Sequence, residues 1–203
     1  MAVVTFAAAP AATAAVIFTD DFSGDSAGTG YVVYSSSLAN WNITQGNVDA
    51  VLNGSYGCAA SSGNCIDLDG TGSPAAARLE TIASFSFVAG EQYTILFSVP
   101  SLNGGANDNY HVSIGTLYDS GTLSGIQNIA APFTVGSSQT ATIVIEVLTP
   151  TNNAGPFLDF VTLNLDASAP PPPPVANVSE PASLAVFGLG LAGLGFMRRR
   201  RAA

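Results

Sequence analysis

Two aspartates stand where paired carboxylates could do chemistry. Asp67 and Asp69 alternate around Leu68, so in a strand both side chains project from one face about 7 Å apart, since strands rise about 3.3 Å per residue. Such a pair could carry out glycoside hydrolysis or bind Ca²⁺, a hard cation that prefers oxygen ligands. A turn formed by Asp69 and Gly70 explains the same residues without a ligand. These three interpretations remain open at this point.

His111 is the only histidine of the chain. Any Ser-His-Asp or Cys-His arrangement must therefore be built on it. It follows Tyr110 in a strand-like run, with Asp108 nearby, and we predict a partly exposed strand histidine. The sequence assigns no apolar pocket that could raise the pKa of Asp67 or Asp69. We therefore predict a body that is not an enzyme, and the alternative is a hydrolase using these two aspartates.

The two cysteines, Cys58 and Cys65, have six residues between them. An even pair in an exported protein favours a local disulfide across a small loop. Zinc is disfavoured because neither histidines nor further cysteines lie nearby.

Aromatic residues offer a second kind of candidate site. Trp41, Tyr56 and Tyr110 could stack on sugar rings if they are exposed, although a lone tryptophan in a β-sandwich usually belongs to the core. If the body binds sugar, we expect weak affinity that depends on an exposed aromatic such as Trp41 or Tyr110.

The charge distribution excludes one class of partner. The chain contains no lysine, and Arg78 is the only arginine before the C-terminal tail. All fourteen acidic residues precede that tail, so residues 1–197 carry a formal charge of −13. A body without a basic patch cannot neutralise phosphates, which argues against nucleic acid as a partner.

Short β-like runs alternate with clusters of Gly, Asn, Ser and Pro from residue 16 to residue 168. Several runs alternate with period two, and no helical period precedes Ala182. This pattern predicts an all-β fold, a single β-sandwich or jelly roll. The predicted strands are Ala15–Phe22, Tyr31–Tyr34, Trp41–Thr44, Val48–Leu52, Cys65–Leu68, Ala77–Ile82, Phe85–Val88, Gln92–Val99, Tyr110–Ile114, Phe133–Val135, Ala141–Leu148 and Phe157–Leu165.

The two ends of the chain differ in composition from this body. Residues 1–15 are typical of a secretory signal remnant, with Ala12-Thr13-Ala14 as a cleavage site. Residues 169–177 form a Pro-rich linker that would be a stiff spacer. Residues 182–197 are uncharged and predict a transmembrane helix, which Arg198, Arg199, Arg200 and Arg201 would hold at the cytoplasmic side. A buried core helix is the alternative, but four consecutive arginines at its end are hard to place.

Ser179, Glu180 and Pro181 precede this apolar segment. The order of motif, apolar helix and arginine tail over residues 178–203 resembles the PEP-CTERM sorting signal of Gram-negative bacteria, with Ser179 in place of the first proline. The resemblance implies recognition by an exosortase-type processing enzyme. It also implies an inner-membrane-anchored precursor that later reaches the cell surface or the extracellular matrix.

The body carries a second resemblance, in four stretches that occur in order. The family pattern is a Trp strand with Gly-x-Val-Asp, an Asp-Leu-Asp-Gly turn, a Gly-x-x-Tyr-Thr strand and a closing Gly-Pro-x-x-Asp-x-Val strand. Here the stretches are Asn40–Asp49, Ile66–Gly70, Gly90–Phe97 and Gly155–Val161. Together they are similar to a galactose-binding-like jelly roll. The resemblance implies a binding or structural module with extracellular polysaccharide as its partner. The alternative hydrolase, using Asp67 and Asp69, would act on exopolysaccharide.

Overall fold

The computed structural model describes residues 14–72, 75–103, 108–148 and 153–167. All of them lie in the first of two compact units, Met1–Ala169. Their regular structure consists of antiparallel strands, which confirms the all-β prediction. Within these residues no helix has the length and apolar character to cross a membrane, and the predicted segment 182–197 lies outside them.

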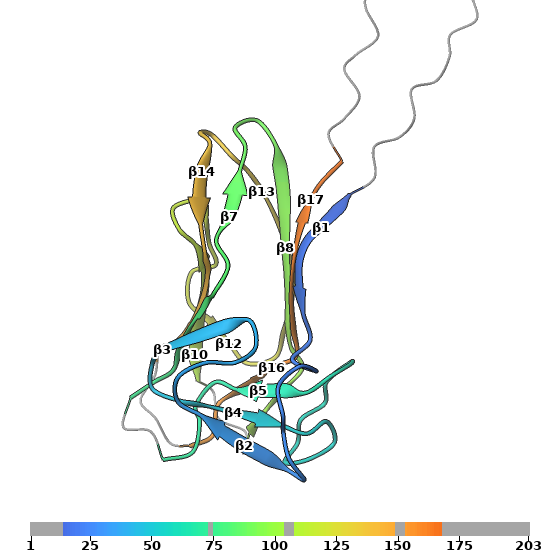
Figure 1. Cartoon of the computed structure of the whole chain (residues 1–203), viewed down its shortest axis with the longest axis vertical. Helices are drawn as coiled ribbons and strands as arrows, with labels where there is room; N and C mark the ends of the chain where they lie inside the picture. Colours follow the sequence, from blue (N-terminus) through green and yellow to red (C-terminus); the bar gives the residue numbers. More distant parts are fainter. Residues whose placement is uncertain (1–13, 73–74, 104–107, 149–152, 168–203) are drawn as a thin grey trace, which may run out of the picture. The chain divides into compact units, whose positions relative to one another are not determined.

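Two sheets run lengthwise and form the layers of a sandwich (Figure 1). The four-stranded sheet has the order β1 (Ala15–Asp20), β17 (Phe160–Leu165), β8 (Gln92–Val99), β13 (Gln127–Thr134). The six-stranded sheet has the order β11 (Tyr118–Asp119), β10 (Asn109–Ile114), β15 (Ile143–Val147), β6 (Arg78–Thr81), β3 (Trp41–Gln45), and β12 (Leu123–Ser124) also pairs with β10. A separate pair, β7 (Phe85–Phe87) and β14 (Gln139–Ala141), lies on the side of the six-stranded sheet.

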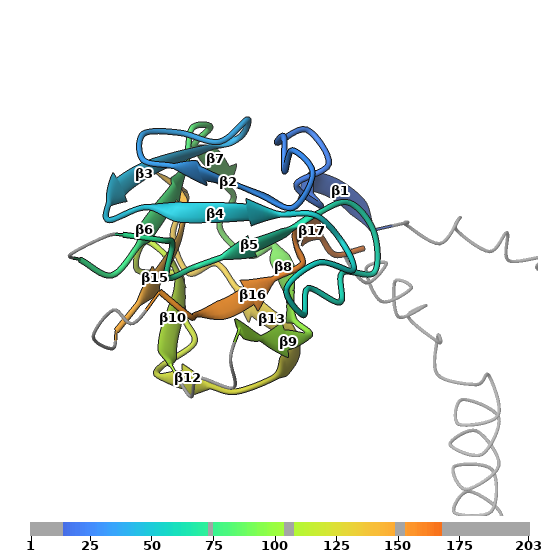
Figure 2. The ribbon, with the colours of Figure 1, turned by 90° about the horizontal axis from the view of Figure 1, so that it is seen from below.

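A five-stranded sheet lies across one end of the two layers. Figure 2 shows it in front, with strands that cross the direction of β8 and β10. Its order is β2 (Tyr31–Tyr34), β4 (Val48–Val51), β5 (Cys65–Asp67), β16 (Pro156–Leu158), β9 (Ser101–Leu102). This end sheet gives the molecule a second, smaller apolar cluster of Val51, Cys58, Cys65 and Phe157.

The main core lies between the layers and follows the predicted alternation. Tyr93, Ile95, Phe97 and Val99 of β8 are all buried, because every second residue of a strand faces the same side. The alternate residues Ile143, Ile145 and Val147 of β15 are buried as well. The period-two pattern therefore identified the faces that pack against each other.

The prediction of one long strand over Phe157–Leu165 is wrong. The chain changes sheet at Asp159, so that β16 belongs to the end sheet and β17 to the four-stranded sheet. The backbone N–H of Asp159 donates to Ser98 at 2.9 Å, and its carboxylate accepts the Ser61 hydroxyl at 2.7 Å. The hydrogen bonds of Asp159 thus stabilise the point at which the chain passes from the end sheet to the four-stranded sheet.

Candidate functional site

The end of β1 is organised by the buried carboxylate of Asp20. Its Oδ1 accepts the backbone N–H of Phe22 at 2.9 Å, which closes a turn, and Phe22 adopts a positive φ of 57°. Its Oδ2 accepts Nε1 of Trp41 at 2.8 Å and Nδ2 of Asn40 at 3.2 Å. A buried carboxylate needs such donors to offset its lost hydration. Asp20 therefore fixes the position of the neighbouring polar side chains.

A polar groove of about 520 Å³ opens beside this carboxylate. The residues that line it carry hydroxyl, amide and carboxylate groups, and one of them is aromatic. The lining residues are Thr19, Asp20, Asp21, Ser23, Gly24, Asn40, Ser62, Phe160 and Thr162. Small-ligand sites are concave, and convergent polar groups in them fix the orientation of the ligand. This groove is our candidate functional site.

Asp21 supplies a fixed negative charge to the groove. The Ser23 hydroxyl and backbone N–H hold the pKa of this carboxyl below its usual value, and the N–H lies 3.1 Å from Oδ1. Across the strand pair, Oγ1 of Thr19 and Oγ1 of Thr162 lie 3.0 Å apart. Asp21 is thus an acceptor for hydroxyl donors, and its lowered pKa makes it unsuited to act as a general acid at neutral pH.

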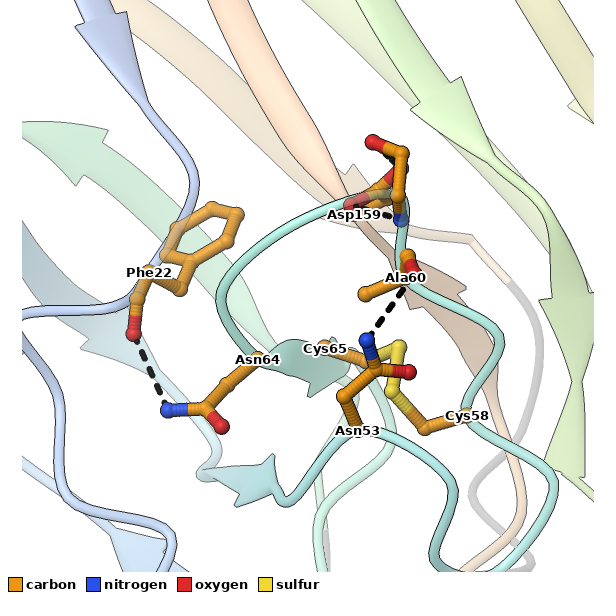
Figure 3. The surroundings of a disulfide bond; sticks show 8 residues. Phe22, Asn53, Cys58, Ala60, Asn64, Cys65 and Asp159 are labelled. Carbon is orange, nitrogen blue, oxygen red and sulfur yellow. Dashed lines mark hydrogen bonds between the residues drawn. A yellow bond between two sulfur atoms is a disulfide. The ribbon is translucent and has the colours of Figure 1, made fainter.

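The loop between β4 and β5 contributes Ser62 to the groove and is closed by a disulfide (Figure 3). Cys58 and Cys65 are bonded, with a Cα–Cα distance of 5.8 Å, which confirms the predicted pairing. Asn64 donates to the backbone oxygen of Phe22 at 3.2 Å, and so ties this loop to the end of β1. The disulfide and this hydrogen bond restrict the loop that forms one wall of the groove.

The expectation that Asp67 and Asp69 project from one face of a strand is wrong. Strand β5 ends at Asp67, so the two residues do not share a strand face. The backbone N–H of Asp69 instead donates to Oδ1 of Asp67 at 3.0 Å, and the N–H of Gly155 donates to the same oxygen at 3.0 Å. Asn103 donates to Oδ2 at 2.8 Å. The Asp67 carboxylate thus joins three chain segments.

Burial controls the titration of Asp67. It raises the pKa of this carboxyl to about 6, the N–H donors from Asp69, Asn103 and Gly155 oppose the shift, and the charge of Asp49 adds to it. Asp67 and Asp69 are 2% and 1% exposed, and neither lines the groove. Within the described ranges no three His, Cys, Asp or Glu side chains are grouped to hold a metal ion. Calcium binding by Asp67 and Asp69 stays a prediction.

The expectation that Trp41 or Tyr110 offers an exposed stacking surface is wrong. Trp41 is 0% exposed and packs against Phe18 and Phe22. Tyr110 is 1% exposed, and burial raises the pKa of its hydroxyl, which donates to the Gly125 oxygen at 3.3 Å. Both rings serve the core because each large side chain faces inward from its strand and its polar atom finds a partner there.

His111 lies on β10, partly buried, between two carboxylates. Its Nδ1 is 3.2 Å from Oε1 of Glu146, and its Nε2 is 2.8 Å from Oδ1 of Asp119. Glu146 also pairs with Arg78 at 3.4 Å. The partly exposed strand histidine is thus as predicted, and its ring is hydrogen-bonded to Asp119 and to Glu146, which is the carboxylate that pairs with Arg78.

The sequence did not identify the groove. One signal was present, since Asp20 and Asp21 lie near the end of the predicted strand Ala15–Phe22, and Ser23 and Gly24 follow that strand. The contributions of Asn40, Ser62 and Thr162 depend on chain segments that meet only in the folded molecule, so no local pattern marks them. The predicted sorting residues Ser179, Glu180, Pro181 and Arg198–Arg201 lie outside the described residues.

The described residues thus define an all-β sandwich protein with a polar groove at the end of its first strand. Residues 177–201 match the family described as the PEP-CTERM protein-sorting motif. The chain therefore carries the sorting signal of an exported protein that an exosortase processes from a membrane-anchored precursor. A search of curated proteins finds no match.

Several solved structures are similar to this chain at low sequence identity. One is a family 35 carbohydrate binding module from Clostridium thermocellum, with 12% identity, a TM-score of 0.40, and coverage of 66% of this chain and 98% of that chain. Another is the K3 adhesin domain of Lys-gingipain from Porphyromonas gingivalis, with 14% identity, a TM-score of 0.42, and coverage of 74% and 98%. A third is a carbohydrate binding module of lichenase 5A from Cellvibrio mixtus in complex with cellotriose, with 17% identity, a TM-score of 0.32, and coverage of 74% and 98%.

Proposed function

We propose that the body is a non-enzymatic binding module for carbohydrate, delivered by its sorting signal to the cell surface or the extracellular matrix. The polar groove carries the proposal. Sugars present many hydroxyls and apolar ring faces, and the groove offers acceptors and donors of matching kind together with the ring of Phe160. A few placed polar groups beside an aromatic surface are what such a ligand requires.

Support for a non-enzymatic role comes from the states of the carboxylates. Glycoside hydrolysis uses two carboxyls about 5–10 Å apart, of which one has a raised pKa. In the groove the pKa of Asp21 is lowered, and both oxygens of Asp20 accept structural hydrogen bonds. Asp67 has the raised pKa, yet it is buried away from the groove lining and holds its own donors.

The proposal is tested by binding and hydrolysis assays on the same protein. The full chain is screened on a glycan array and then incubated with the polysaccharide of the producing organism. We expect binding without release of reducing ends. Thr162→Val replaces one hydroxyl of the groove by a methyl group and should weaken binding about five- to tenfold, because one lost hydrogen bond costs about 1 kcal/mol or more. Thr116→Val, the same change at an exposed site, serves as the control.

The alternative is a hydrolase that uses Asp67 and Asp69, and the raised pKa of Asp67 is the observation in its favour. Measurable turnover that Asp67→Asn or Asp69→Asn abolishes, while the fold is retained, would overturn the non-enzymatic proposal. A protein that binds no glycan and cleaves none would overturn both.

A further inference from the structure

Two exposed tyrosines stand together at the edge of the end sheet. Tyr31 belongs to β2 and is 42% exposed, and Tyr56 follows β4 and is 63% exposed. Their ring centroids lie 5.4 Å apart, with an interplanar angle of 87°. In contrast, Tyr93 and Tyr110 are buried in the core. An exposed aromatic pair leaves ring surface available to a ligand.

The backbone around Tyr56 holds this arrangement in place. Tyr56 has a φ of 49°, a strained conformation for a non-glycine residue that the surrounding structure must enforce. The N–H of Ser55 donates to Leu52 and the N–H of Cys58 donates to Ser55, each at 2.8 Å. Nδ2 of Asn53 donates to the Ala60 oxygen at 3.0 Å, and the Cys58–Cys65 disulfide closes the loop (Figure 3). A platform fixed in advance loses less entropy when a ligand binds.

Gly30 provides the space that the ring of Tyr56 occupies. A Cβ added at Gly30 would lie 3.2 Å from Cε2 of Tyr56 and 3.6 Å from its hydroxyl oxygen. The ring of Tyr56 therefore packs over Gly30, the residue before β2, while the rest of the ring faces solvent. The position of the ring depends on a residue without a side chain.

The chemistry of the surrounding segments selects the ligand class. Residues 26–48 and 50–66, which carry both tyrosines, contain no Asp, Glu, Lys, Arg or His. Asp49 between them is buried and accepts the Thr71 hydroxyl. A charged ligand would find no counter-ion in these segments, so the surface fits an uncharged one.

The size of the platform argues against a protein partner. At the observed exposures the two tyrosines offer roughly 200 Å², given about 200 Å² for a whole aromatic side chain. A stable protein interface needs about 800 Å² per partner. A flat aromatic surface of this extent fits a ring-sized ligand.

We propose that Tyr31 and Tyr56 form a stacking site for the sugar rings of an uncharged glycan. This inference rests on the proposed carbohydrate-binding function and adds a site that is lined by none of the groove residues. The loop between β4 and β5 borders both, since it carries Tyr56 and Ser62. The tyrosines would stack on the apolar face of a pyranose, whereas the groove would form hydrogen bonds with sugar hydroxyls.

The test uses the full chain in a detergent without sugar groups, by affinity gel electrophoresis in dextran, in galactan and in the anionic polysaccharide alginate. We expect retardation by at least one uncharged polymer and none by alginate. Tyr56→Ala and Tyr31→Ala should each raise the dissociation constant about tenfold, the usual effect of truncating an aromatic anchor. Tyr56→Phe keeps the ring and should bind normally. Ile126→Ala, at a residue that is 61% exposed on another loop, is the matched control.

Gly30→Ala provides a second variant that keeps both tyrosines. It should displace the ring of Tyr56 and lower affinity, while fluorescence of the buried Trp41 reports an unchanged core. Wild-type affinity in Tyr31→Ala and Tyr56→Ala, with weakened binding in Thr162→Val, would overturn the stacking site and leave the proposed function standing. Absence of binding to every polymer by the wild-type chain would overturn both. A dimer that Tyr56→Ala converts to a monomer would show that the surface is a protein interface, and would also overturn the stacking site.

Discussion

At Asp67, burial and hydrogen bonding act in opposite directions on one carboxyl. Its pKa of about 6 in the folded state exceeds the ordinary value of 3.8. Between these two values the folded protein binds more protons than the unfolded chain, so the free energy of unfolding falls as pH rises from about 4 to 6. The shift of about two units corresponds to about 2–3 kcal/mol.

The first prediction concerns this pH dependence. Asp67→Asn keeps an oxygen that accepts the N–H groups of Asp69 and Gly155. The NH₂ group that it introduces can donate to Asn103 if the side-chain amide of Asn103 rotates so that its oxygen faces this position. We expect the variant to lose most of the decline in stability between pH 4 and 6. Urea denaturation at several pH values measures it. An unchanged pH profile in the variant would show that another group causes the decline.

Trp41 provides the second prediction. Trp41→Phe removes the N–H that Asp20 accepts at 2.8 Å and leaves space in the core. A lost hydrogen bond to a buried carboxylate and a small cavity together should cost about 2–4 kcal/mol. Thermal unfolding measures the loss, and Ile126→Ala, at an exposed site, should change stability by less than about 0.5 kcal/mol. A Trp41→Phe variant as stable as the wild type would mean that Asp20 finds another donor.

At the scale of the element, the loop closed by Cys58 and Cys65 yields the third prediction. Because the closed loop is short, replacing both cysteines by serine should lower the free energy of unfolding by at most about 2–3 kcal/mol. Chemical denaturation of the double variant measures this loss. Thiol labelling of the exported protein is the complementary check, since two reactive thiols without reductant would show that the bridge is absent in the cell.

The strands show what the sequence could predict and what it could not. The alternating apolar residues of β8 and β15 were sufficient to predict these strands and their buried faces, because apolar residues at every second position indicate a strand with one buried face. β13 was predicted only near Phe133, since its eight residues alternate weakly and contain Pro132, which an edge strand tolerates. The break at Asp159 depends on Ser61 and Ser98, both distant in sequence. The groove was missed for the same reason, because its walls come from separate segments.

At the scale of the whole molecule, the sorting motif yields the fourth prediction. We expect an envelope enzyme to cleave near Pro181, because the Glu180-Pro181 pair, the apolar run and the arginines occur in that order. Mass spectrometry of the mature protein should find a C-terminus before Leu184. Pro181→Ala should accumulate the uncleaved precursor. Surface-exposed protein that still ends with Arg201 would contradict the prediction.

The place of β17 in its sheet has a mechanical consequence. The chain leaves the described body directly after this strand, which lies between β1 and β8. The groove residues Phe160 and Thr162 lie at the start of β17, and its last residue, Leu165, is paired with Ala15 and Tyr93. A bound polymer that pulls against a C-terminal attachment would therefore apply tension along β17. Inter-strand hydrogen bonds lie perpendicular to the strands, so both ladders would be loaded in shear and would have to fail together before the strand could be drawn out.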